Sequence, residues 1–490
     1  MMMCPSHSIH NMFLTLSVIF MLQELITVDA WLSHNPFGSV LIPKSSSLFS
    51  SSSTTSSSIL EDPAVIVAPP SWDELSEHLT EIQQSSNEEG PVPLITLFRD
   101  TNGWCPFCER VWFALKIKNI PYQETLINLY DKPKWFLDMV PTGLVPVVLI
   151  HIDTIEKQKE GQRDDDEAET KTKPQRTMVW ESLDILKALD EHFPDTPKLI
   201  YEDDEEYMNG RKLVNELSNV GFQYVYNMRN ETLTAEEKET QLVKFEEKLD
   251  ELDEFIGSHT KSSFFLDEIS GLDVEAVPTL ERWRYQLPLT KNMDITDGRP
   301  NIKKWFAALD QYQPYVERVA GDEYSWTAVA STFLKLFGSN KDGLSQETKD
   351  TIAKVEKEAD DLRSKFQLNP HDSDLFTKEL LEDGGVEAAA KLIQNHDAIV
   401  KDCTNKGPKS QEDLGRAEDE KNADWVVRTV AAKLLGVTST DSTESFDLDE
   451  NDAAKAAKII SSRLCVPRDM GSPAAAVLRY ELANLLSALE

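Results

Sequence analysis

Two cysteines stand three positions apart in the stretch NGWCPFCER, residues 102–110, with a proline directly after the first. The spacing of Cys105 and Cys108 fits three kinds of chemistry: a redox dithiol, half of a metal site, or one nucleophile with a second thiol beside it. The other three of the chain's five cysteines are far apart in sequence and do not form a disulfide framework. This pair is therefore the first candidate for function.

The elements around the pair predict that Cys105 begins a helix. Residues 91–100 form a compact apolar run typical of a buried strand, and residues 105–120 have the apolar spacing of an amphipathic helix. Pro106 suits the first helical turn, where its missing N–H is not needed. A helix N-terminus stabilises a thiolate, and Arg110 adds positive charge. These features favour Cys105 as a nucleophile.

Cys108 lies one turn further along the same helix face, and two roles stay open for it. It is either a resolving thiol that forms a disulfide with Cys105 or a passive core residue. A metal centre is the least favoured interpretation, because zinc takes four ligands and no second CxxC or pair of histidines lies nearby in sequence. We therefore expect no metal.

The following segments predict an α/β domain over residues 91–200. Apolar runs at 121–130, 143–150 and 176–180 predict three more strands, and a second helix follows the last of them. The order strand–helix–strand, then strand–strand–helix, is that of a thioredoxin-like fold. The highly charged stretch 153–175 is expected to be a disordered surface insertion.

Beyond this domain the pattern becomes helical. Residues 201–325 predict an all-α domain, in which Ser270 and Asp273 form a capping box at the start of one helix. Residues 326–490 predict a helical extension to which we assign no chemistry. Residues 61–90 form a polar lead-in with one short helix. The expected fold class is thus α/β plus all-α, with a helical C-terminal extension.

Residues 1–60 have the features of a targeting region. An apolar run at 12–22 has the length of a signal peptide and is too short to span a bilayer, and the Ser/Thr-rich, acid-poor stretch 45–59 is typical of transit peptides. Together they resemble the bipartite presequence of algae with secondary plastids, so we expect a plastid protein. The alternative is a secretory signal followed by a linker.

The charge balance excludes some partners. The 490 residues include 50 basic and 85 acidic side chains, which gives a net charge of −35. Nucleic acids and anionic lipids are bound by clustered positive charge. We therefore expect neither a nucleic-acid partner nor stable membrane insertion of the mature chain.

Several of these motifs, in this order, resemble a known family. The stretch CPFCERVWFALKIKNIPYQETLINLYDKPKWF, followed by PTGLVPVVLI and VWES, is similar to the glutathione-binding domain of cysteine-type glutathione S-transferases, with the omega class and dehydroascorbate reductases nearest. FFLDEISGLDVEAVPTLERW is similar to their helical second domain. The resemblance covers residues 92–325 and implies glutathione as co-substrate and a homodimer as a candidate assembly.

The resemblance also implies a glutathione site. Pro146 matches the cis-proline of the family, which turns the backbone of Val145 toward the cysteinyl part of glutathione. Glu181 and Ser182 match the residues that meet its γ-glutamyl end. Lys132 matches the lysine that meets its glycine carboxylate, with Lys134 as the alternative. Two further sets complete the expected site: Phe107 beside the nucleophile, and Trp283, Arg284 and Tyr285 as contacts of the second substrate.

The expected function is a glutathione-dependent thiol–disulfide oxidoreductase, similar to thioltransferases and dehydroascorbate reductases. It would act on a small oxidised or disulfide substrate through a mixed disulfide between Cys105 and glutathione. The alternative from another class is a non-catalytic scaffold or binding protein that is similar to a glutathione transferase. Retention of Cys105, Glu181 and Ser182 favours the enzyme.

Overall fold

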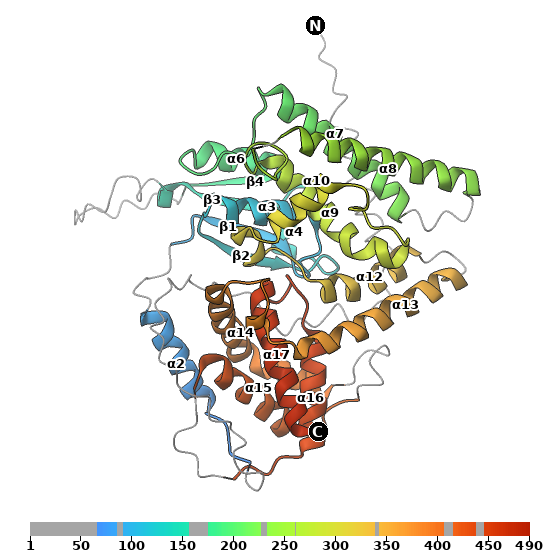
Figure 1. Cartoon of the computed structure of the whole chain (residues 1–490). Coiled ribbons are helices and arrows are strands. Elements are labelled where there is room, and N and C mark those ends of the chain that lie inside the picture. Colours follow the sequence, from blue (N-terminus) through green and yellow to red (C-terminus); the bar gives the residue numbers. More distant parts are fainter. Residues whose placement is uncertain are drawn as a thin grey trace, which may run out of the picture.

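The computed structural model of the chain describes residues 66–85, 92–155, 175–226, 233–259, 261–338, 343–405, 415–437 and 445–490. The targeting region at 1–60 and all but the ends of the charged insertion at 153–175 lie outside these ranges. Figure 1 shows a central sheet with one group of helices above it and another below it. Within the described ranges, no helix is both long and apolar enough to cross a membrane.

The sheet has the thioredoxin-like arrangement that the sequence predicts. Its strands run in the order β2-β1-β3-β4; β1 is parallel to β2, and β3 is antiparallel to both β1 and β4. Helix α3 joins β1 to β2, α4 joins β2 to β3, and α6 follows β4. The bounds are β1 Ile95–Asp100, α3 Pro106–Ile117, β2 Tyr122–Ile127, α4 Lys134–Met139, β3 Val147–His151, β4 Arg176–Trp180 and α6 Ser182–His192.

Alternation along the strands decides which helices cover each face. Val148 and Ile150 of β3 belong to the large core that contains the apolar residues of α3 and α6. Val147 and Leu149 belong to a smaller cluster with Phe136 of α4. Successive side chains of a strand point to opposite faces. Helices α3 and α6 therefore cover one face of the sheet, and α4 covers the other.

A helical domain follows the sheet and packs on α3 through α9. The predicted capping box at the start of α9 is confirmed. The Ser270 hydroxyl accepts a backbone N–H from the first turn of the helix, and the Asp273 carboxylate accepts the backbone N–H of Ser270. Asp273 also accepts a hydrogen bond from the Trp305 indole at 2.9 Å. The bounds are α7 Glu205–Tyr226, α8 Ala235–Ser258, α9 Gly271–Thr290, α10 Pro300–Leu309 and α11 Gln313–Val316.

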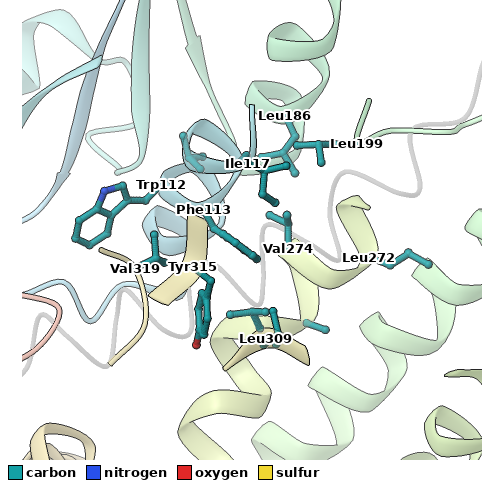
Figure 2. Packing of buried hydrophobic residues seen from close by; sticks show 14 of the residues in the cluster. Trp112, Phe113, Ile117, Leu186, Leu199, Leu272, Val274, Leu309, Tyr315 and Val319 are labelled. Atoms are coloured by element: carbon teal, nitrogen blue, oxygen red, sulfur yellow. The ribbon is translucent and has the colours of Figure 1, made fainter. Parts of the chain in front are cut away.

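One apolar core runs from the sheet into this helical domain (Figure 2). Phe113 of α3 lies at its centre, beside Val274 of α9 and Leu309 of α10. The Phe113 ring centroid is 5.2 Å from that of Tyr315 in α11. The helix that follows Cys105 is therefore anchored to both domains.

The C-terminal extension is helical, as predicted, and builds a second core from α14, α15, α16 and α17. Trp425 is the largest side chain in that core and is 1% exposed. Helix α12 crosses from the first helical domain and packs on both α9 and α13. The bounds are α12 Glu323–Gly338, α13 Gln346–Arg363, α14 Lys378–Thr404, α15 Glu420–Leu435, α16 Glu450–Arg463 and α17 Ser472–Leu489.

The short helix of the N-terminal lead-in is present as α2, Trp72–Ser85, and belongs to this second core. Its apolar residues Leu75 and Leu79 pack there, and the Trp72 indole donates to the Asp424 carboxylate at 2.9 Å. Figure 1 shows α2 at the left flank of the bundle, beside α14 and α15. A segment that precedes the sheet in sequence therefore completes the bundle that follows it.

The linker between α16 and α17, residues 464–471, contacts the turn that leads to Cys105. Gly103 in that turn has φ +65°, and a Cβ atom there would lie 3.4 Å from the Arg468 backbone. The preceding residue of the linker is held as well, because the Arg318 guanidinium donates to the Pro467 carbonyl at 2.5 Å. The extension is thus packed against the β1–α3 turn.

We predict that Gly103→Val destabilises the chain more than Gly436→Val does. Both glycines have left-handed φ, +65° and +67°, but nothing lies within 4 Å of a Cβ at Gly436. Both variants force valine into a left-handed backbone conformation that glycine adopts without strain. Only the Gly103→Val side chain also crowds the α16–α17 linker, which lowers the free energy of unfolding by about 1–3 kcal/mol more. Urea unfolding of the two full-length variants measures the difference. Equal losses would show that the linker does not confine the turn.

Candidate active site

The functional residues converge because of the strand register. Phe98 of β1 pairs with Val147 of β3, which in turn pairs with Trp180 of β4. The residues that follow β1, precede β3 and follow β4 therefore meet at one end of the sheet. These are Cys105 with its turn, Pro146 with Val145, and Glu181 with Ser182; Lys132 follows β2, whose last residue pairs with Asp100.

Cys105 is the N-cap residue of α3, and Pro106 is the first residue of the helix, as the sequence predicts. The Cys105 side chain makes no capping hydrogen bond and is partly exposed. The first N–H groups of a helix lack partners within the helix and carry its partial positive charge. Its thiol therefore lies at the positively charged end of α3 and is partly open to solvent.

Asp100, the last residue of β1, holds the turn before Cys105. Its Oδ2 atom accepts the backbone N–H groups of Trp104 at 2.8 Å and of Cys105 at 3.2 Å. The residue is only 2% exposed. Sequence reasoning missed Asp100, since an acidic residue at the end of a strand is an ordinary start of a loop.

The two thiols are unequal. Cys108 is 1% exposed, whereas Cys105 is partly exposed. Burial, followed by the hydrogen bond and the charge of Cys105, holds the pKa of the Cys108 thiol well above its ordinary value. Cys108 is therefore a neutral thiol in the reduced protein, and Cys105 is the thiol that faces the opening.

Arg110 places a buried positive charge near this thiol. Its guanidinium lies over the Phe107 ring, 5.3 Å from the ring centroid. Burial lowers the pKa of Arg110, and the nearby Glu275 carboxylate and the Cys105 thiol act against that shift.

The helical domain holds the same turn from the other side. Arg282 of α9 donates to the Trp104 carbonyl at 3.0 Å and forms a buried ion pair with Glu109 of α3 at 2.7 Å. Its guanidinium also lies over the Trp326 ring of α12, 4.4 Å from the centroid. Sequence reasoning missed Arg282 as well, because its partners are about 180 residues earlier in the chain.

The expected glutathione residues lie on the other strands of this end. The peptide bond between Val145 and Pro146 is cis. Glu181 has φ +69° at the start of α6, Ser182 is buried, and partial burial raises the pKa of the Glu181 carboxyl. Partial burial also lowers the pKa of Lys132. These residues follow β2 or β4, or precede β3, and so lie at the same end of the sheet as Cys105.

The three residues of α9 expected to contact a second substrate, Trp283, Arg284 and Tyr285, lie in three different environments. Trp283 is 1% exposed and packs edge-on against the Phe245 ring, 4.9 Å between centroids, so it is a core residue of the helical domain and presents no face to a ligand. Arg284 pairs with Asp310 at 2.8 Å. Only Tyr285 joins the apolar cluster around Trp104, which it shares with Trp326 and Cys465.

A buried acid lies behind this arrangement. Glu281 of α9 accepts hydrogen bonds from the Tyr315 hydroxyl at 2.5 Å and from the Gly321 N–H at 2.8 Å. Burial and then the charge of Glu109 raise the pKa of Glu281 to about 8. Glu281 is therefore protonated in the folded protein at neutral pH.

Two family models match parts of this chain. Residues 104–192 match "Glutathione S-transferase, N-terminal domain", and residues 235–308 match "Glutathione S-transferase, C-terminal domain". The first range contains Cys105 and the glutathione residues expected from the sequence, and the second contains α9 and α10. Both matches lie within the part of the chain that the sequence analysis assigned to this family.

Curated relatives align with somewhat less than half of the chain. Protein IN2-1 homolog A of Oryza sativa subsp. japonica is 25% identical over 236 residues, which are 48% of this chain and 84% of that protein. Glutathione S-transferase L2, chloroplastic, of Arabidopsis thaliana is 26% identical over 44% of this chain and 62% of its own length. Glutathione S-transferase omega-1 of Mus musculus is 27% identical over 46% and 82%.

Solved structures align over a similar range. Glutathione transferase Omega 3C from Trametes versicolor is 20% identical and covers 55% of this chain and 97% of its own, with a TM-score of 0.37. Dehydroascorbate reductase from Chlamydomonas reinhardtii is 22% identical and covers 45% and 90%, with a TM-score of 0.34.

We predict that Glu281→Gln gains stability relative to the unsubstituted chain as the pH rises. The folded pKa of about 8 exceeds the ordinary value of 4.5, so the stabilising contribution of protonated Glu281 is complete below about 4.5 and is lost as the pH rises through about 8. The loss is at most about 1.4 kcal/mol per pH unit. Glutamine keeps the accepting oxygen and does not ionise.

Urea unfolding of both proteins at pH values of about 6 and about 8 measures this effect. The difference in unfolding free energy should move in favour of Glu281→Gln at the higher pH. An identical difference at both pH values would contradict the protonated state of Glu281.

Proposed function

Because the chain carries both domains of the glutathione S-transferase family and a long C-terminal extension, we propose that it is a glutathione-dependent thiol–disulfide oxidoreductase with Cys105 as its nucleophile. The observation that carries the proposal is the asymmetry of the thiol pair. Cys105 is the partly exposed N-cap of α3, and Cys108 lies buried behind it. A family member with a cysteine at this position attacks with its own sulfur, rather than only activating the sulfur of glutathione.

The proposed reaction is two successive thiol–disulfide exchanges. The Cys105 thiolate attacks the glutathione sulfur of a mixed disulfide R–S–S–G, which forms Cys105–S–S–G and releases R–S⁻, and the leaving thiolate takes a proton from water. The thiolate of a second glutathione then attacks the glutathione sulfur of that intermediate. Glutathione disulfide leaves, and Cys105 returns to its thiolate.

The residues around the opening have the chemistry to bind glutathione. The N–H and C=O groups of Val145 precede β3 and can pair with the peptide part of glutathione. Ser182 and the N-terminus of α6 suit a carboxylate, and Glu181 suits an ammonium group. Lys132 supplies a positive charge for the second carboxylate, and the Phe107 ring lies against the Arg110 guanidinium.

We propose that glutathione, rather than Cys108, resolves the intermediate. The raised pKa of Cys108 keeps it a neutral thiol, which is a poor nucleophile. Glutathione can attack the mixed disulfide from solvent without any change in α3. Cys108 is only 1% exposed, so α3 would have to rearrange for its sulfur to attack. The reaction therefore needs one protein thiol.

We further propose that residues 1–60 direct the chain to a plastid. The presequence-like composition supports this, and one relative, from Arabidopsis thaliana, is named chloroplastic. A fluorescent protein fused after residue 60 should accumulate in the plastids of an alga with secondary plastids. Its appearance in the secretory pathway or outside the cell would favour the secretory alternative.

We predict that Cys105→Ser abolishes glutathione-dependent reduction of a model mixed disulfide and of dehydroascorbate, with a loss on the order of 100-fold or more, because a serine hydroxyl is a far weaker nucleophile than a thiolate at neutral pH. Cys108→Ser should keep most of the activity. Cys403→Ala, which alters a buried thiol in the bundle core, is the matched control and should keep it as well.

The outcomes separate the alternatives. Full activity in Cys105→Ser would refute the mechanism, and a comparable loss in Cys108→Ser with a trapped glutathione adduct would establish the dithiol route. Absence of glutathione binding to the unsubstituted chain in calorimetry would favour a non-catalytic scaffold instead.

A further inference from the structure

The proposed function leaves Cys108 without a chemical role, yet the structure places a third ligand group beside the thiol pair. The two sulfur atoms and a carboxylate oxygen of Asp100 all lie within 4.8 Å of one another. Asp100 and Cys108 are buried, and Cys105 is partly exposed. Three groups that bind metals as anions therefore converge at the end of β1, with one side open.

The Asp100 carboxylate has an oxygen available for such a ligand. Its Oδ2 atom accepts the two N–H groups of the turn, whereas its Oδ1 atom is buried and has no hydrogen-bond partner among the described residues. A buried carboxylate oxygen without a partner is costly and calls for a ligand, an ion or a proton to complete it. The residue is 98% buried, since only 2% of it is exposed.

We propose that Asp100, Cys105 and Cys108 form a binding site for a thiophilic closed-shell cation, Zn²⁺ or Cd²⁺, with the two sulfurs and Asp100 Oδ1 as ligands. Tetrahedral ligands of zinc at about 2.0–2.3 Å lie about 3.5–3.8 Å apart, so the site closes with movements of about 1 Å. The fourth position faces the open side and takes water or a small thiol. On binding, each thiol that is protonated releases its proton to water.

The surroundings suit this ligand set. Two thiolates and a carboxylate carry one negative charge more than the cation neutralises. The N-terminus of α3 carries partial positive charge, and the buried Arg110 guanidinium interacts electrostatically with Cys105, so both offset part of that excess. The spacing D-x₄-C-x₂-C joins a strand end, a tight turn and a helix start, so the backbone presents all three groups without a long loop.

The site gives Cys108 a function that does not depend on redox chemistry. A cation held by Cys105 occupies the sulfur that the proposed reaction needs and therefore inhibits it reversibly. Binding of the cation itself does not rest on the proposed function, because it requires neither glutathione nor a second substrate. Failure of one proposal therefore leaves the other intact.

Titration of the reduced full-length chain with Cd²⁺ tests the site through the ultraviolet thiolate-to-cadmium charge-transfer band, and competition with a chromophoric chelator gives the Zn²⁺ affinity. We expect one tight equivalent per chain. Cys105→Ser and Cys108→Ser should each lose it. Asp100→Asn, which keeps an oxygen for the two N–H groups of the turn, should bind at least about tenfold more weakly.

Two variants serve as matched controls. Cys4→Ser and Cys403→Ala remove thiols elsewhere in the chain and should leave the tight equivalent unchanged. Survival of the tight equivalent in either Cys105→Ser or Cys108→Ser would overturn the proposal, as would an affinity of Asp100→Asn equal to that of the unsubstituted chain. The two serine variants test the site even where Asp100→Asn proves unstable.

Discussion

Cys105, at the N-cap of α3, follows a turn whose backbone N–H groups need hydrogen-bond partners inside the protein. Asp100 meets this requirement, since one carboxylate oxygen accepts the N–H groups of both Trp104 and Cys105. These two bonds fix the direction in which α3 leaves the sheet. Because α3 carries Phe113 into the core shared with the helical domain, the position of Cys105 and the packing of two domains depend on the same turn.

The turn is confined from three sides by residues distant in sequence. Asp100 holds its N–H groups, Arg282 of the helical domain holds the Trp104 carbonyl, and the α16–α17 linker packs on Gly103. The extension is therefore more than an appendage to a transferase-like unit. Its α16–α17 linker packs against the turn that precedes the nucleophile. Its Cys465 also belongs to the apolar cluster that contains Trp104 and Tyr285.

Local patterns in the sequence predicted the fold well, because strand alternation, helical spacing and a capping box are properties of a few neighbouring residues. The strands of the sheet, the start of α3 at Pro106 and the cap at Ser270 are of this kind. The long-range contacts escaped prediction. Arg282 donates to a carbonyl 178 positions away, and a single hydrogen bond between such distant residues produces no periodic pattern in the sequence.

The same distinction explains the individual site residues. The spacing of Cys105 from Cys108 and the proline after it mark Cys105 in the sequence. Asp100 has a role only because β1 ends at it, which places its carboxylate beside the N–H groups of the turn. Trp283 shows the opposite error: an aromatic residue late in a helix has the composition of a binding site and the position of a core residue. Which face a helix buries depends on its partner, here Phe245 of α8.

Helix α2 gives the chain an unusual order of assembly. It is among the first elements to leave the ribosome, yet its partners α14 and α15 are among the last, and the Ile66 carbonyl accepts the N–H of Phe446 at 2.7 Å. Contacts between residues so far apart in sequence are slow to form. Leu75 and Leu79 therefore stay exposed to solvent while the intervening domains are synthesised. Helix α2 thus joins the bundle only after α14 and α15 have been synthesised, and a chain that stops before them leaves the apolar face of α2 uncovered.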